Sequence, residues 1–226
     1  MGRTPAGAHS AVNLLMWRPT PRTLVIAFLS ALALVLVVGG AWFWYSAQQE
    51  RIQAVHADAL SQAYAVRNPQ AAADARARAS VALESALTQA PNAPLAMQSA
   101  YELGNIRFDN AQYDAARAAY DIALRNARTS ATLRALARAG SASTWEAQRD
   151  FPRAVEAYTV ALADAKPGQF YYEELLISLG RVQELAGRRD DAIQSYRRLL
   201  KDAPKLKRES EIRGRLASLG VSVDLR

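Results

Sequence analysis

The side chains that most often carry out chemistry are few and scattered in this chain. It contains two histidines, His9 and His56, and no cysteine. Its adjacent acidic pairs are Glu173-Glu174 and Asp190-Asp191. Neighbours on a helix point in different directions, so neither pair forms a shared carboxylate site, and both suit the first turn of a helix. A lone histidine such as His56 is most often a surface or packing residue.

No motif of a known catalytic or nucleotide-binding site occurs in the sequence. GxGxxG, the P-loop, HExxH and GxSxG are all missing, and without cysteine there is neither a thiolate metal site nor a cysteine nucleophile. We therefore expect no enzymatic activity, no metal, no cofactor and no small-molecule substrate. The net charge is +7, but basic and acidic residues alternate along predicted helices, which is typical of a solvated face. Nucleic-acid binding is accordingly not expected.

The elements around these residues are predicted to be helices only. Ala, Leu, Arg, Glu and Gln dominate the composition and favour helix, and no extended alternation of β-branched residues indicates a sheet. One segment is apolar throughout: LVIAFLSALALVLVVGGA, residues 24–41, followed by the aromatic run 42–45. A helix over 23–45 is roughly 34 Å long, which matches a hydrocarbon core of about 30 Å, with the aromatic rings at one interface.

This segment is predicted to be a retained transmembrane helix, the alternative being a cleaved signal peptide. It exceeds the usual apolar length of a signal, and no small-x-small cleavage site follows cleanly. Three arginines and no acid precede the span, so the positive-inside rule places the N-terminus in the cytoplasm and residues 46–226 outside. Residues 1–22, which contain several prolines and glycines, are predicted to be a disordered basic cytoplasmic tail.

A repeated pattern of small and aromatic residues organises the rest of the chain. LGNIRFDNAQYDAARAAYDIAL at 103–124, ASTWEAQRDFPRAVEAYTVAL at 142–162 and LGRVQELAGRRDDAIQSYRRLL at 179–200 align on Ala116, Ala154 and Ala192. The period is therefore 38 residues in both intervals. Each unit is predicted to be two antiparallel helices in close contact at these alanines. Stacked units then bury the apolar face that one pair would leave exposed.

The pattern resembles the tetratricopeptide repeat (TPR), whose signature is a Leu-Gly pair, a turn glycine, an alanine, an aromatic residue, an alanine and a proline. The third unit matches best, with Gly180, Gly187, Tyr196 and Pro204 among its signature residues. Ala111 and Arg149 stand in place of the turn glycine in the first two units. The resemblance implies an α-solenoid with three repeats at about 95–128, 133–166 and 171–204. The alternative is an unrelated array of helical hairpins.

Further helices are predicted on both sides of the three repeats. Residues 46–94 form a degenerate helical pair, whose first helix can continue from the membrane span. Residues 205–226 form a capping helix and tail, with Lys207, Arg208, Arg213 and Arg215 among the residues facing water.

The resemblance also implies a binding surface, because the first helices of such units line a concave face. The inward positions carried over from the repeat are Gln98, Tyr101, Asn105, Phe108, Asp109, Ser143, Glu146, Ile177, Arg181 and Glu184. Exposed aromatic rings beside polar groups suit an extended peptide or a helix. The alternative for Tyr101 and Phe108 is that they only pack on the preceding helices. Trp145 is predicted to belong to the core.

Together these features predict a single-pass, membrane-anchored TPR scaffold. A short basic tail, one span and an external repeat domain resemble the ancillary subunit of the Sec translocon in a bacterial inner membrane. That resemblance implies translocon subunits or periplasmic chaperones as partners. The alternative is an assembly factor of another envelope complex, such as secretion, pilus or cell-division machinery.

Overall fold

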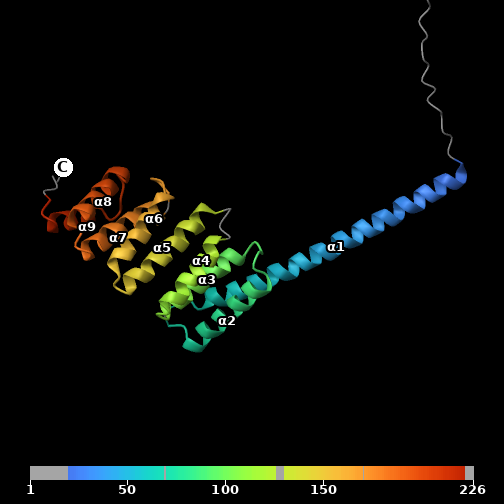
Figure 1. The fold of residues 1–226 in the computed structure, drawn as a ribbon, viewed down its shortest axis with the longest axis horizontal. Helices are drawn as coiled ribbons and strands as arrows, with labels where there is room; N and C mark the ends of the chain where they lie inside the picture. The colour runs from blue at the N-terminus through green and yellow to red at the C-terminus, as the bar shows by residue number, and fades with distance from the viewer. Residues whose placement is uncertain (1–19, 69, 126–129, 170, 222–226) are drawn as a thin grey trace, which may run out of the picture. The chain divides into compact units, whose positions relative to one another are not determined.

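The computed structural model describes residues 20–221 apart from 69, 126–129 and 170, and these residues form helices joined by turns and short connections. Nine α-helices and no strand occur in these residues, which confirms the predicted all-α class (Figure 1). His9 and nearly all of the predicted disordered tail, residues 1–22, lie outside them. The chain divides into two compact units, Met1–Gln49 and Glu50–Arg226.

The first unit contains most of helix α1, which spans Pro21–Ala65 and contributes its last residues to the second unit. The apolar side chains of this part of α1 are exposed; Phe28, for example, is 68 % exposed and Trp42 70 %. Within the described residues it is the one helix that is long and apolar enough to cross a membrane. Length and composition alone do not separate such a span from a secretion signal.

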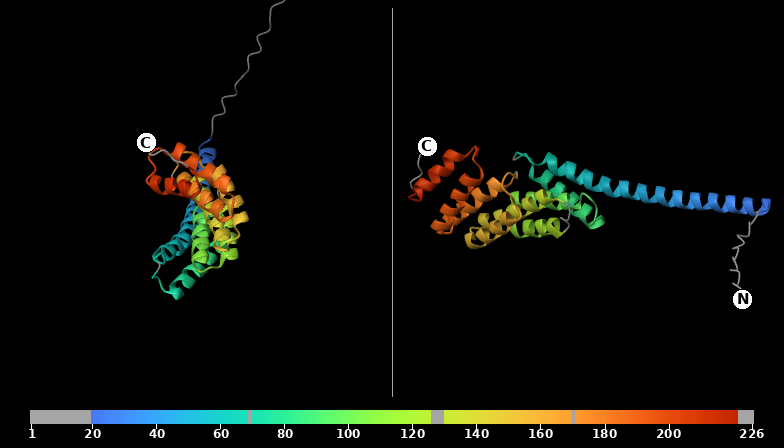
Figure 2. Two further views of the ribbon diagram at one scale, coloured as in Figure 1. Left: turned by 90° about the vertical axis from the view of Figure 1, so that its left-hand side faces the viewer. Right: turned by 90° about the horizontal axis from the view of Figure 1, so that it is seen from above.

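The second unit is built from helix pairs that follow one another in chain order. The pairs are α3 (Ala96–Asp109) with α4 (Tyr113–Arg125), α5 (Ala131–Ala147) with α6 (Phe151–Ala163), and α7 (Tyr172–Leu185) with α8 (Arg189–Asp202). Each pair also packs on the next, through α4 with α5 and α6 with α7. α2 (Ala73–Gln89) packs on α3 at the start of the stack. Figures 1 and 2 show these helices side by side in sequence.

Small residues at the aligned positions allow the helices of each pair to approach closely. Ala116, Ala154 and Ala192 are each 0 % exposed, as the repeat alignment predicts. The aromatic residues four positions later, Tyr120, Tyr158 and Tyr196, are buried as well. Gly104 faces the ring of Tyr120 and Gly180 faces that of Tyr196. This packing is that of a TPR-like helical repeat fold.

The three tight turns share one backbone conformation although their sequences differ. Ala111, Arg149 and Gly187 have φ values of 56°, 60° and 72°, which is the left-handed region that favours glycine. In each turn the next amide donates to the carbonyl five residues before it, as in Gln112 N to Arg107 O at 2.8 Å. This is the bond of a Schellman cap, which satisfies a carbonyl at the helix end. The first two units therefore keep the turn without the glycine.

Helix α9 (Glu209–Ser218) closes the C-terminal end of the stack. It buries Ile212 and Leu216 in the same cluster as residues of α7 and α8. Arg208 is exposed, as predicted, and also pairs with Glu174 of α7. Arg215 was also expected to face water, but it is half-buried and pairs with Glu184 of α7. The capping helix thus packs on the third repeat through charged as well as apolar contacts.

His56 is a buried packing residue at the other end of the second unit. Its side chain is 0 % exposed. Its Nδ1 lies 2.8 Å from Ser99 Oγ, and its Nε2 lies 3.0 Å from the carbonyl oxygen of Ala90. A carbonyl can only accept, so Nε2 donates to Ala90, while Nδ1 is hydrogen-bonded to the Ser99 hydroxyl. His56 therefore ties the end of α1 to the beginning of α3.

Candidate protein-binding groove

A groove of about 590 Å³ runs across the first helices of the three repeats. Its walls come from the first helices α3, α5 and α7. Two residues of the second helices, Tyr120 of α4 and Tyr158 of α6, also line it. The lining includes five aromatic residues: Tyr101, Phe108, Tyr120, Tyr158 and Tyr171. This is the kind of surface, mostly apolar with a few placed polar groups, that ligands use.

Six of the ten predicted contact residues line this groove. They are Tyr101, Asn105, Phe108, Ser143, Glu146 and Arg181. They come from all three repeats, because residues at equivalent places of successive first helices lie on one side of the stack. The remaining four residues lie elsewhere.

Ile177 corrects the prediction for the third repeat. It is 3 % exposed and belongs to the cluster that contains Ile212 and Leu216 of α9. Glu184 does not line the groove either, since its carboxylate accepts from the Tyr196 hydroxyl and pairs with Arg215 of α9 at 3.3 Å. At Glu184 the capping helix thus occupies a position that the repeat pattern offers to a partner, whereas Ile177 is buried in the core.

Gln98 and Asp109 also lie outside the groove lining. The Gln98 amide donates to the hydroxyl of Tyr64, so it belongs to the contact between α1 and α3. Asp109 is exposed at the last position of α3.

The two aromatic residues of the first repeat both line the groove and pack on their neighbours. Tyr101 and Tyr120 have ring centroids 6.0 Å apart, and Phe108 meets Tyr113 edge-on at 5.7 Å. Both side chains are half-buried. Packing therefore orients these rings and leaves part of each available in the groove.

A connected set of polar groups crosses the groove from α5 to α7. Tyr158 Oη lies 2.9 Å from Ser143 Oγ and donates to Glu146 Oε2 at 3.1 Å. Two guanidinium nitrogens of Arg181 donate to the same carboxylate, one to Oε1 and the other to Oε2 at 3.0 Å. Such a fork fixes geometry as well as charge. The central charges of the groove therefore compensate each other.

The tyrosine hydroxyls around the groove stay protonated. Burial raises the pKa of Tyr120 and Tyr158 above the ordinary phenol value, and does the same for Tyr101. Tyr120 donates to Asn105 Oδ1 at 2.9 Å. The groove consequently offers neutral rings and hydroxyls rather than phenolate charge.

Sequence reasoning missed several lining residues, including Leu136, Gly140, Tyr171 and Ser178. Gly140 could have been predicted to lie in a close helix contact, because a glycine inside a helix usually has a packing reason. A Cβ added there would lie 2.5 Å from Tyr120 Cζ. Tyr120 is thus held between Gly104 of its own repeat and Gly140 of the next one.

Trp145 lies outside this groove; it is half-buried and packs against the core cluster that contains Ala142 and Ala154. Its ring is covered by the guanidinium of Arg117 at 3.6 Å and approached by that of Arg153 at 4.8 Å. It lines a separate hollow of about 420 Å³ formed with α6. Arginine stacking is therefore added to the apolar packing at this position.

The described residues contain no group of three or more His, Asp or Glu side chains arranged to hold a metal ion. No family model and no curated protein sequence matches the chain. Among solved structures, one described as the crystal structure of MamA protein is similar at 20 % identity and a TM-score of 0.47, over 66 % of this chain and 69 % of that chain. This similarity is too distant to carry an assignment. The packing of its own residues gives the chain a TPR-like helical repeat fold.

Proposed function

We propose that this chain is a membrane-anchored scaffold that holds a segment of a partner protein in the groove of its repeat domain. The observation that carries the proposal is the groove itself, with aromatic residues from successive repeats on one side of the stack. Repeat stacks use such extended surfaces for binding other proteins.

The groove favours a segment with aliphatic or aromatic side chains. Ring faces supply contact area at low cost in conformational entropy. The carboxylate of Glu146 is already engaged by Arg181 and Tyr158, so the centre holds no uncompensated charge for a charged side chain to meet. An extended peptide or one face of a helix meets these requirements.

The anchor is residues 23–45 of α1. Open apolar side chains along this stretch support a lipid environment, and the exposed rings of Trp42 and Trp44 suit an interface. The arginines before the span support a cytoplasmic N-terminus and a repeat domain on the extracytoplasmic side. The membrane of this proposal is a bacterial inner membrane.

With this topology, partners of the Sec translocon or periplasmic chaperones are the first candidates. The second candidate is an assembly role in another envelope complex, for which the same anchor and groove would serve. The two differ only in what the groove holds.

Site-specific photo-crosslinking in intact membranes tests the groove. A photoreactive residue at Ala147, which is exposed and lines the groove, should give discrete adducts. The same residue at Val81 of α2, 65 % exposed and not part of the lining, is the control. Adducts with translocon subunits or chaperones support the first role, and adducts with secretion, pilus or division components support the second.

A charge placed in the groove sharpens this experiment. Leu136→Glu puts a carboxylate among the half-buried lining residues and should abolish the Ala147 adducts. Val160→Glu on α6, at a side chain 55 % exposed outside the groove, should leave them intact. A binding role for the groove is contradicted if Ala147 and Val81 give equal adducts and if Leu136→Glu, in a variant that still folds, leaves these adducts unchanged.

A further inference from the structure

The C-terminal end of the repeat domain carries a concentration of positive charge. Residues 188–221 contain ten Lys and Arg against five Asp and Glu, whereas residues 50–187 contain fourteen against fifteen. The excess lies in Arg188, in α8 and above all in the connection from α8 to α9, whereas α9 itself is balanced.

Local carboxylates compensate only part of this charge. Arg198, Arg213 and Arg215 pair with Asp202, Glu209 and Glu184. Within the described residues, another set of exposed cations has no ion pair: Arg197, Lys201, Lys205 and Lys207. We call these four residues the basic patch.

The basic patch is compact in sequence and on the helix. Arg197 and Lys201 are one turn apart on the exposed side of α8, and Lys205 and Lys207 follow directly in the connection to α9. Like charges four residues apart disfavour the helix. The helix dipole favours Lys201 in the last turn, but it gives no reason for the whole set. An anionic surface would relieve the repulsion.

The character of the patch distinguishes between kinds of anionic partner. A stable protein interface has an apolar core with anchoring side chains. No large hydrophobic residue between 188 and 221 is exposed. A lipid surface needs no such anchor, because clustered Lys and Arg side chains are attracted by the summed charge of its headgroups.

We infer that the basic patch binds anionic phospholipid headgroups. This inference rests on the membrane anchor of the proposed function, which confines the domain near a bilayer and raises the effective concentration of the second contact. Within the second unit, α9 and residues 50–65 are the last and first elements of the stack. Span and patch would therefore hold the repeat domain by both of its ends.

The test uses the full chain in lipid nanodiscs. The absence of native cysteine allows one dye to be placed through Ser210→Cys, an exposed position of α9. Energy transfer to an acceptor on the lipid should be higher in discs containing phosphatidylglycerol than in discs of phosphatidylcholine alone, and should fall as salt rises.

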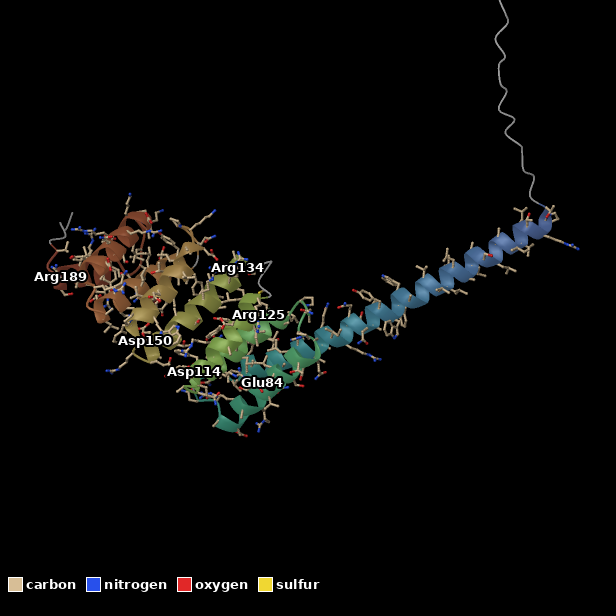
Figure 3. The ribbon with its side chains drawn as sticks, viewed as in Figure 1. Glu84, Asp114, Arg125, Arg134, Asp150 and Arg189 are labelled. Atoms are coloured by element: carbon tan, nitrogen blue, oxygen red, sulfur yellow. The ribbon has the colours of Figure 1, made fainter. Side chains whose placement is uncertain are left out.

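Paired variants assign the effect to the patch. Neutralising one cation should weaken association with the anionic surface roughly fivefold, so Lys201→Gln with Lys205→Gln should remove most of the additional energy transfer. Arg125→Gln with Lys166→Gln removes two exposed cations without ion pairs elsewhere in the domain and should leave it unchanged. Figure 3 shows Arg125 on α4, away from Arg189 on α8.

The outcomes separate this inference from the proposed function. Energy transfer that is equal in both lipids, or unchanged by the patch variant, overturns lipid binding and leaves an acidic protein as the alternative, while the groove adducts remain. Failure of the chain to incorporate into discs overturns the anchor and the lipid contact together. If Ala147 gives no adducts while the energy transfer still depends on the lipid, only the proposal of a binding groove is overturned.

Discussion

Replacing Gly140 with alanine tests the contact that joins the first repeat to the second. Tyr120 is 2 % exposed, and its hydroxyl donates to Asn105. An added Cβ at residue 140 would lie 2.5 Å from Tyr120 Cζ and 2.9 Å from its Oη. Helix α3 lies equally close to the other side of the ring, since an added Cβ at Gly104 would lie 2.5 Å from Tyr120 Cε1. The ring therefore has no room to move toward α3.

The expected magnitude is the difference between two opposing effects. Overpacking a close-packed site typically costs about 1–3 kcal/mol. Alanine gains up to about 1 kcal/mol over glycine within a helix. Gly140→Ala should therefore lower the free energy of unfolding by up to about 2 kcal/mol. Gly214→Ala in α9, where an added Cβ meets nothing within 4 Å, should show only the helical gain and raise it.

Urea denaturation followed by circular dichroism measures both changes. Tyr120→Leu provides the matched background, since removing the ring should remove the cost of Gly140→Ala although Tyr120→Leu is itself destabilising. A double-mutant cycle then gives the coupling between the two positions. If Gly140→Ala is as stable as Gly214→Ala, the close approach of the ring to α5 is refuted.

Four further outcomes follow from the same structure. Ala154→Leu, at a site 0 % exposed, should destabilise the domain by about 1–3 kcal/mol, and an unchanged melting temperature contradicts the repeat alignment. Arg149→Gly, at φ 60°, should stabilise by about 0.5–1 kcal/mol, since glycine adopts this conformation without strain; a lower melting temperature contradicts that reason. Burial raises the pKa of Tyr120 and Tyr158, so the unfolded chain loses phenolic protons first and stability should fall as pH rises above about 10. A melting temperature constant across that range, or a decline undiminished in Tyr120→Phe, contradicts a role for this tyrosine. A reporter fused to the C-terminus should be active outside the cytoplasm, and cytoplasmic activity overturns the proposed orientation.

The helix pairs could be predicted from the sequence because their packing depends on local spacing. Ala116, Ala154 and Ala192 recur at one period, and each must be small for its two helices to touch. The turn could also be located without its glycine. Arg149 occupies the left-handed position because the paired helices on either side dictate the backbone there.

The composition of the groove depended on contacts between residues far apart in the chain. A repeat pattern treats equivalent positions alike, so it placed Ile177 and Glu184 on the same surface as Tyr101 and Phe108. Only the tertiary structure shows that α9 covers the third repeat and engages Glu184 through Arg215. It likewise shows that Arg181 reaches Glu146 of the preceding repeat. The sequence by itself determined which helices form and where they must be close, since those are short-range steric requirements. Which side chains remain available to a partner was decided by long-range packing, because neighbouring helices compete for the same faces.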